Sequence, residues 1–290
     1  MSDGNAASPR SNCLFDLAPP DINWFLKRSD IVLIPMGSLE QHGPHLPLGT
    51  DSITALEVAK RAARLAEVPY TPTIWAGYSP QHLREPESGI GTITLRANTL
   101  NEVLYDVARS LIHHGWNKLI FVNGHGSNVK VIDPVLRRIR YETCSMVCLY
   151  KPYAERYMGM LKDLLENPPD ETPGWHASEL ETSQVMAHNV DLVRMDRAVD
   201  TRAHAPSWLP KGFAKADGAP DVEFRGYQYF TFPMDHGEFT DTGVIGNPFR
   251  ATAVKGEEAF NRFAKHLAEA IDAFRPLKVD VRRRAFDDRV

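Results

Sequence analysis

The chain has 290 residues, 43% of them hydrophobic, and a formal net charge of −4 at pH 7. This length is enough to bury the core of one α/β domain, and the slightly acidic balance predicts no broad basic surface for nucleic acid. No stretch approaches the roughly 18 apolar residues of a membrane span, and the first ten residues lack the apolar core of a signal peptide. We therefore expect a cytoplasmic protein without a membrane partner.

Strand and helix patterns alternate along the first half of the chain. In chain order we expect a helix over 20–28, a strand at 31–35, a helix over 51–67 and a strand at 68–75. A long loop over 77–97 follows. After it we expect a helix over 100–114, a strand at 118–122, a helix over 129–141 and a strand at 145–150. The strands are near-continuous apolar runs, which is typical of strands covered on both faces. The alternation predicts an α/β fold: three α/β/α layers around a mostly parallel central sheet, in a single domain.

The second half of the chain is less regular. We expect a helix and a Pro-rich turn over 158–173, a helical segment over 175–189, an irregular stretch over 190–240 that could form a lid or an oligomer contact, and a closing helix over 251–274. The domain should cover 20–275, between a flexible segment at 1–19 and a tail at 276–290. Within the tail, Arg282, Arg283 and Arg284 read as solvated side chains. The three cysteines, Cys13, Cys144 and Cys148, are an odd number without close pairs and predict no disulfide scaffold.

A loop rich in ligand-type side chains follows the first expected strand. It presents Glu40, His42, His45 and Asp51 among several glycines and prolines. Residues i and i+2 of an extended segment point the same way, so Glu40 and His42 can face one site. Asp51 directly precedes the next helix, and capping of that helix is the alternative reading. This composition predicts a metal site at the end of a buried strand, which usually serves hydrolysis.

A second cluster, residues 123–128, follows another apolar strand and contains His125. Loops at the carboxyl ends of parallel strands build the site of doubly wound sheets, so His125 should converge with the first loop if the two strands are neighbours. Gly124 and Gly126 allow close approach of the backbone. Binding of a phosphate is the alternative, although the loop has neither a Walker lysine nor the spacing of a dinucleotide fingerprint.

A third cluster lies in residues 175–183 and contains His176, Glu179 and Glu181. If the segment is helical, His176 and Glu179 share a face, and Glu181 points elsewhere unless the first residues are extended. The alternative is an ordinary acid-rich first turn of a helix.

Together these blocks resemble the signature of the creatininase family. Residues 37–51, 123–128 and 176–183 look like three family blocks in the family's order, and residues 242–256 resemble a fourth. The resemblance covers residues 20–275. It implies an α/β/α hydrolase that forms a homo-oligomer, often a hexamer, and that carries one or two divalent ions. Zinc is the first expectation, with manganese or iron as alternatives.

The resemblance also assigns roles to individual residues. By motif match, Glu40 and His125 would bind one metal, His42 the other, and Asp51 would bridge them. His176 matches a catalytic histidine that donates a proton to the leaving group. Glu181 matches a glutamate that binds the second metal or takes part in catalysis.

The chain departs from the creatinine-hydrolysing members at two places. They carry a ligating glutamate two residues after the histidine of the second block, where this chain has Ser127. The second metal would then be held through Glu179 or Glu181, or the site would be mononuclear. Those members also enclose their substrate with tryptophans, whereas the corresponding strand end here carries Lys151, which favours an oxygen-rich or anionic substrate unless it is only a solvated loop lysine.

Further candidate substrate contacts are Gln81, His82, Ser127 and Trp175. The resemblance implies that water activated by the metals attacks a carbonyl of a small, cyclic and polar substrate. The broken bond is an amide C–N bond or, as in members that open a cyclic diketo-inositol, a C–C bond. Other members open formamidopyrimidine rings or trim peptides. A non-catalytic small-molecule or metal-binding protein is the alternative of another class, with Ser127 marking a lost ligand.

Overall fold

The centre of the fold is a three-stranded parallel sheet. The computed structural model describes residues 8–154, 159–166, 176–215, 218–219 and 221–287. The sheet has the order β1-β2-β3 and consists of β1 (Ile31–Met36), β2 (Lys118–Asn123) and β3 (Met146–Tyr150). Ile31 pairs with Lys118, which pairs with Met146, so the three carboxyl ends lie at one edge.

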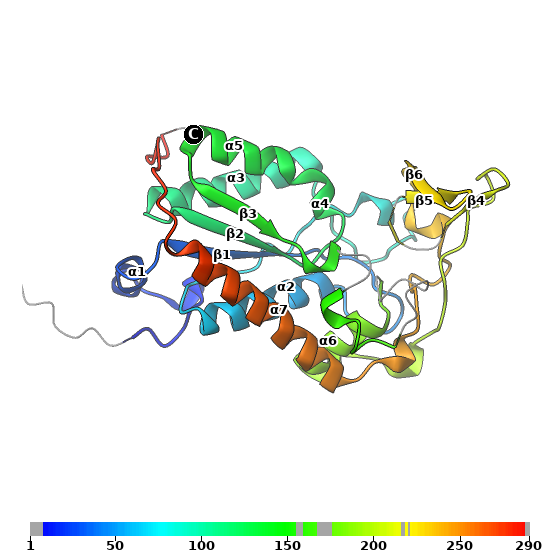
Figure 1. Ribbon diagram of the computed structural model, residues 1–290. Helices are drawn as coiled ribbons and strands as arrows, with labels where there is room; N and C mark the ends of the chain where they lie inside the picture. Colours follow the sequence, from blue (N-terminus) through cyan, green and yellow to red (C-terminus); the bar gives the residue numbers. More distant parts are fainter. Residues whose placement is uncertain (1–7, 155–158, 167–175, 216–217, 220, 288–290) are drawn as a thin grey trace, which may run out of the picture.

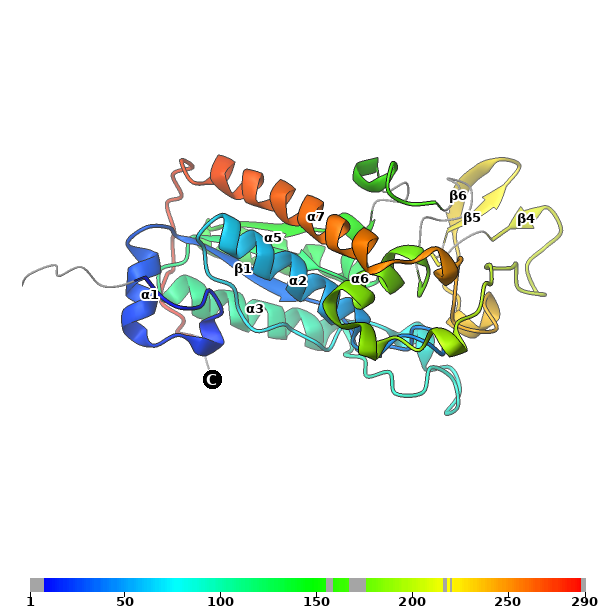
Figure 2. The same cartoon turned by 90° about the horizontal axis from the view of Figure 1, so that it is seen from below.

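Alternate side chains of the sheet enter two separate cores. Ile31 and Leu33 pack with α2 (Thr50–Leu65) and α7 (Ala253–Phe274). Val32 and Ile34 pack on the opposite face with α3 (Ala97–His113) and α5 (Asp133–Thr143). Figures 1 and 2 show these helix pairs on the two sides of the sheet. The three-layer α/β/α arrangement around a parallel sheet is therefore confirmed.

The remaining helices connect the sheet to its surroundings. They are α1 (Pro19–Leu26), α4 (Asn128–Val131) and α6 (Glu179–Asn189), the last packed against α7 and α2. Short 3-10 helices cover Leu14–Asp16, Pro80–His82, Pro152–Ala154, Gly159–Leu161, Val190–Leu192, Met195–Arg197, His236–Glu238 and Pro248–Arg250. None of the helices within the described ranges is long and apolar enough to cross a membrane.

A second, antiparallel sheet lies beyond the carboxyl edge of the first (Figure 1). It has the order β4-β5-β6 and consists of β4 (Phe213–Ala214), β5 (Asp221–Phe224) and β6 (Tyr227–Thr231). Arg225 and Gly226 close the β5–β6 hairpin with φ of 52° and 85°, the left-handed conformations that two-residue hairpin turns need. The expectation that residues 190–240 are wholly irregular is therefore wrong for this hairpin.

Prolines account for two other differences from the expected elements. The segment 68–75 is not a regular strand and makes only isolated bridges to β1, because Pro69 and Pro72 have no N–H for a continuous ladder. The expected helix over 129–141 is split into α4 and α5, and Pro134 occupies the first turn of α5, where its missing N–H costs nothing. Of the helix expected over 158–173, the described part contains only a 3-10 turn.

Of the three arginines of the tail, Arg282 and Arg283 are exposed as expected, whereas Arg284 is bonded to the rest of the domain. The Arg284 guanidinium donates to Ile112 O at 2.9 Å and to Asn117 Oδ1 at 2.7 Å. The buried Arg109 of α3 donates to the carbonyl oxygens of Arg283 and Ala285. These bonds hold the described part of the tail against α3, so the expectation of a solvated side chain is wrong for Arg284.

Candidate metal centre

Five buried side chains from different elements meet at the carboxyl edge of the parallel sheet. Glu40 and His42 lie in the loop after β1, His125 follows β2, Asp51 is in the first turn of α2, and Glu181 is in the first turn of α6. Each is at most 9% exposed. The parallel register explains the convergence, because it places the ends of β1 and β2 side by side.

The five side chains form two groups of potential ligands that share one carboxylate. The first consists of Glu40, Asp51 and His125, and the second of His42, Asp51 and Glu181; within each group the ligand atoms lie within 4.8 Å of one another. Asp51 Oδ2 is 3.0 Å from His125 Nδ1, and Asp51 Oδ1 is 3.3 Å from His42 Nε2. Asp51 therefore turns one oxygen toward each histidine.

Three buried ligand atoms that make no hydrogen bond indicate that these residues fit divalent ions. Glu40 Oε2, His42 Nε2 and Asp51 Oδ2 are buried and make no hydrogen bond of good geometry, and their ion-pair neighbours are other members of the same two groups. Buried polar atoms are normally paired, so three orphans that face one space indicate that an ion completes them. Carboxylate and imidazole donors of this kind suit zinc, manganese or iron. The residues present thus fit the one or two divalent ions that the family resemblance implies.

Hydrogen bonds set the tautomers of the two histidines. His42 Nδ1–H donates to Glu40 O at 3.1 Å, so Nε2, which faces Asp51, is the nitrogen that would bind an ion once its own proton has left. His125 Nε2–H donates to Tyr78 O at 3.0 Å and lies 3.1 Å from Ser79 Oγ, which leaves Nδ1 directed at Asp51. Support of this kind on the far nitrogen is typical of metal-binding histidines.

The protonation of the metal-free cluster follows from burial and facing charges. Burial opposes a charged His42, but Asp51 and the other carboxylates outweigh it and raise its pKa to about 10. Burial is likewise outweighed at His125, whose pKa is raised to about 9 by Glu40 and Asp51. Burial raises the pKa of Glu181 to about 7. The metal-free cluster therefore holds protons where the ions would bind.

Asp51 does not cap its helix. α2 begins at Thr50, its N-cap residue is Gly49, and no side chain makes the capping hydrogen bond. The capping alternative for Asp51 is therefore wrong.

Glu179 and His45 lie outside both groups. Glu179 is fully buried, and its carboxylate accepts from Lys255 Nζ at 2.6 Å and from Glu166 N at 3.0 Å. His45 Nε2 lies 3.0 Å from Thr182 Oγ1. Of the two glutamates considered for the second metal, only Glu181 reaches the centre.

His176 belongs to a layer of rings beside the metal centre. Its ring stacks on His42 with centroids 4.4 Å apart, and its Nδ1 is 4.0 Å from Glu40 Oε1. His82 and His236 join the layer, and Gln41 Nε2 lies 3.3 Å and 3.0 Å from their Nδ1 atoms. Burial lowers the pKa values of His176 and His236 well below the usual range, so both rings are neutral.

His236 and Gln41 were not predicted as site residues from the sequence. His236 lies in a stretch that was expected to be irregular, and no apolar strand precedes it. Gln41 stands between two ligand candidates, and only the structure shows its amide among the rings.

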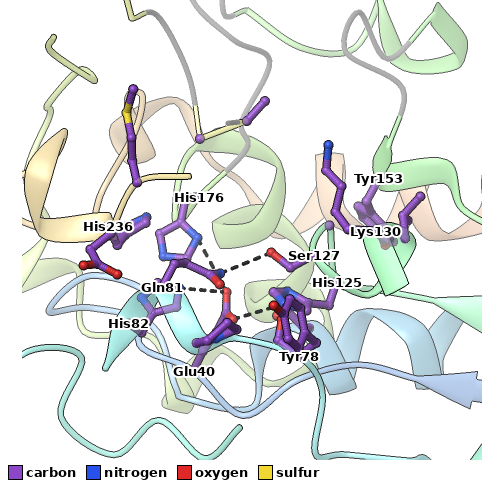
Figure 3. Close-up of a pocket in the computed structure, with 18 of the residues that line it drawn as sticks. Glu40, Tyr78, Gln81, His82, His125, Ser127, Lys130, Tyr153, His176 and His236 are labelled. Atoms are coloured by element: carbon purple, nitrogen blue, oxygen red, sulfur yellow. Dashed lines mark hydrogen bonds and ion pairs between the residues drawn. The ribbon is translucent and has the colours of Figure 1, made fainter. Parts of the chain in front are cut away.

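A cavity of about 850 Å³ opens beside the centre. Figure 3 shows His82, His176 and His236 on one side of it and Ser127, Lys130 and Tyr153 on the other. The predicted contact residues Gln81, His82, Ser127 and Lys151 all line this cavity. Gln81 Nε2 donates to Ser127 Oγ at 3.2 Å. The fifth, Trp175, lies outside the described residues.

Comparison with known proteins identifies the family. Residues 16–271 match the model of the Creatininase family, described as creatinine amidohydrolase. A creatinine amidohydrolase from Pseudomonas putida is 29% identical over 252 residues, covering 83% of this chain and 88% of that protein. A 3-dehydro-scyllo-inosose hydrolase from Thermotoga maritima is 26% identical over 251 residues, covering 85% and 78%.

The fold comparison agrees with the sequence comparison. A solved mutant creatininase described as Zn-Zn type superposes with a TM-score of 0.69 at 26% identity, covering 93% of this chain and all of that one. The resemblance read from the sequence blocks is therefore confirmed. With the family match spanning most of its length, the chain belongs to the creatininase family.

Proposed function

We propose that the protein is a metal-dependent hydrolase that opens a small, cyclic and polar substrate by attack on an amide carbonyl. The observation that carries the proposal is the pair of ligand groups that share Asp51, with unpartnered buried atoms facing the same space. Membership of a hydrolase family supports it.

In this proposal Glu40, Asp51 and His125 hold one ion, and His42, Asp51 and Glu181 hold a second. Ions in such positions lower the pKa of a water molecule and polarise the substrate carbonyl. The protein itself supplies a buried, pre-positioned ligand set, so little reorganisation is needed as negative charge develops on the carbonyl oxygen.

His176 is the proposed proton carrier. Its Nε2–H donates to Gln41 O at 2.9 Å, so the neutral ring keeps its lone pair on Nδ1, the nitrogen that faces Glu40. Burial lowers the pKa of His176, so that Nδ1 is unprotonated before turnover. It can accept the proton of the attacking water and pass it to the leaving nitrogen.

Cleavage of a C–C bond between ketones is the second candidate. The relative from Thermotoga maritima is described as a 3-dehydro-scyllo-inosose hydrolase. Both reactions begin with attack on a carbonyl carbon, so the same ligands and the same histidine serve either one.

The test is a turnover screen of the full-length chain. Lactams, formamides, cyclic diketones and short peptides are incubated with protein that is metal-free or loaded with zinc, manganese or iron. We expect one cyclic class to be opened only by the loaded protein. Glu40→Gln should abolish this turnover, whereas Glu87→Gln, which changes an exposed carboxylate outside the centre, should not. A chain that binds no divalent ion after reconstitution would overturn the proposal.

A further inference from the structure

Two lysines that have no acidic partner in the described part of the chain line the cavity. Lys130 is in α4, just after the loop that carries His125, and Lys151 directly follows β3. Both side chains are exposed at the cavity. Among the described residues, neither lysine ammonium group lies within ion-pair distance of a carboxylate or makes a hydrogen bond. Their positive charges are therefore uncompensated within this part of the chain.

Apart from Glu40, Asp51 and Glu181 of the metal centre, the acidic residues that line the cavity are engaged with other groups. Asp235 and Glu238 face the Arg84 guanidinium at 4.0 Å and 3.7 Å. Asp221 accepts a hydrogen bond from Thr231 Oγ1 at 2.5 Å. These acids come from β5 and from the segment after β6, whereas the lysines come from the edge of the parallel sheet. Outside the metal centre, the lysines and the acids of the lining thus come from different elements.

Ser127 adds to this difference. It lies between His125 and Lys130 in the chain, lines the cavity, and accepts a hydrogen bond from Gln81. A carboxylate at this position would repel an anion near the lysines, and the hydroxyl does not. The lining contributed by Ser127, Lys130 and Lys151 is therefore neutral to positive.

We propose that Lys130 and Lys151 form an anion subsite and that the substrate carries a carboxylate or phosphate group besides the carbonyl that is attacked. This inference rests on the proposed function, since it names the class of substrate for the same site. A cavity of about 850 Å³ is within the range of pockets that hold drug-sized ligands, so it has room for a second group. Ammonium groups are compact charges that bind either type of anion.

The test compares amides that differ only in charge. The zinc-loaded, full-length chain is titrated calorimetrically with 5-oxoproline and its uncharged primary amide, and with glutaramate and glutaramide. We expect each anion to bind roughly tenfold tighter than its neutral partner at low salt, and the preference to shrink as salt screens the lysines. Competition with inorganic phosphate and with acetate then shows which type of anion the subsite prefers.

Variants assign the preference to the lysines. Lys130→Met and Lys151→Met should each reduce it about threefold, and the double variant should remove it while the neutral amides bind as before. Lys130→Arg should retain it. Lys265→Met, which removes an exposed lysine of α7 outside the cavity, is the matched control and should change nothing.

Two results would overturn the subsite. The anionic and neutral amides could bind equally, or the preference could survive in the double variant, in which case the anion binds elsewhere. Zinc content separates this failure from failure of the proposed function. Equal binding by a chain that holds its zinc rejects only the subsite, whereas a chain that binds no zinc rejects the hydrolase itself.

Discussion

Replacement of Asp51 by asparagine should remove both proposed ions at once. Asp51 is the residue shared by the two ligand groups, and it turns one oxygen to His125 and the other to His42. Asn keeps the size of the side chain but loses the negative charge that both ions would share. Glu181→Gln makes the same chemical change in a residue that belongs to only one of these two groups, so it is the matched control.

The size of the effect follows from linkage between metal binding and folding. At free metal 100-fold above its dissociation constant, an ion that binds only the folded chain stabilises it by about 2.7 kcal/mol, and two ions by about 5 kcal/mol. For a chain of this size, each kcal/mol raises the unfolding temperature by roughly 2 °C, so two ions should raise it by about 10 °C. Asp51→Asn should lose nearly all of this rise, and Glu181→Gln about half.

Differential scanning fluorimetry of metal-free and zinc-saturated protein measures the rise, and mass spectrometry of the metal content checks its origin. Because Gly49 rather than Asp51 is the N-cap residue of α2, loss of a helix cap cannot account for a change in the variant. An Asp51→Asn variant with the full metal-dependent rise and the full metal content would refute the shared-carboxylate assignment.

Three further predictions concern protons, catalysis and backbone packing. Despite burial, the facing carboxylates raise the pKa of His42 to about 10 and that of His125 to about 9 in the metal-free chain. Both rings are then charged at pH 7, and Glu181, whose pKa is raised to about 7, is about half protonated. Zinc titrations in buffers of different ionisation enthalpy should therefore show roughly two to three protons released, and an affinity that rises with pH. Release of no protons would contradict the ligand roles. His176→Gln should keep its zinc but lose roughly 100-fold in turnover, and loss of zinc as well would make His176 a ligand. A Cβ on Gly124 would lie against Asp51 O, so thermal unfolding should show Gly124→Ala destabilised by about 1–3 kcal/mol. Gly126, with no atom within 4 Å of such a Cβ, should tolerate alanine, and equal losses in the two variants would disprove this explanation.

Much of the fold could be predicted because its central elements carry strong local patterns. β1 and β2 are six-residue runs that are buried at every position, and α2 and α3 have clear apolar faces. The antiparallel sheet could not be predicted, since β4 to β6 are only two to five residues long and mostly exposed. Their aromatic side chains show no alternation between a buried and an exposed face.

The candidate site was predictable where side chains directly follow strands. Glu181 was ambiguous, because a helix through residues 175–183 would turn it away from His176. The structure resolves this: His176 is extended and bridges Ile245, Ala177 has a φ of 54°, and α6 begins only at Glu179. His236 had no comparable signal, because its position depends on the tertiary packing of the segment after β6.

The most direct test of the metal centre is anomalous diffraction at the zinc absorption edge from crystals of the zinc-loaded chain. We expect two peaks, one among Glu40, Asp51 and His125 and one among His42, Asp51 and Glu181, with Asp51 bound to both. Zinc absent from these side chains, or bound only at another cluster, would contradict the assignment.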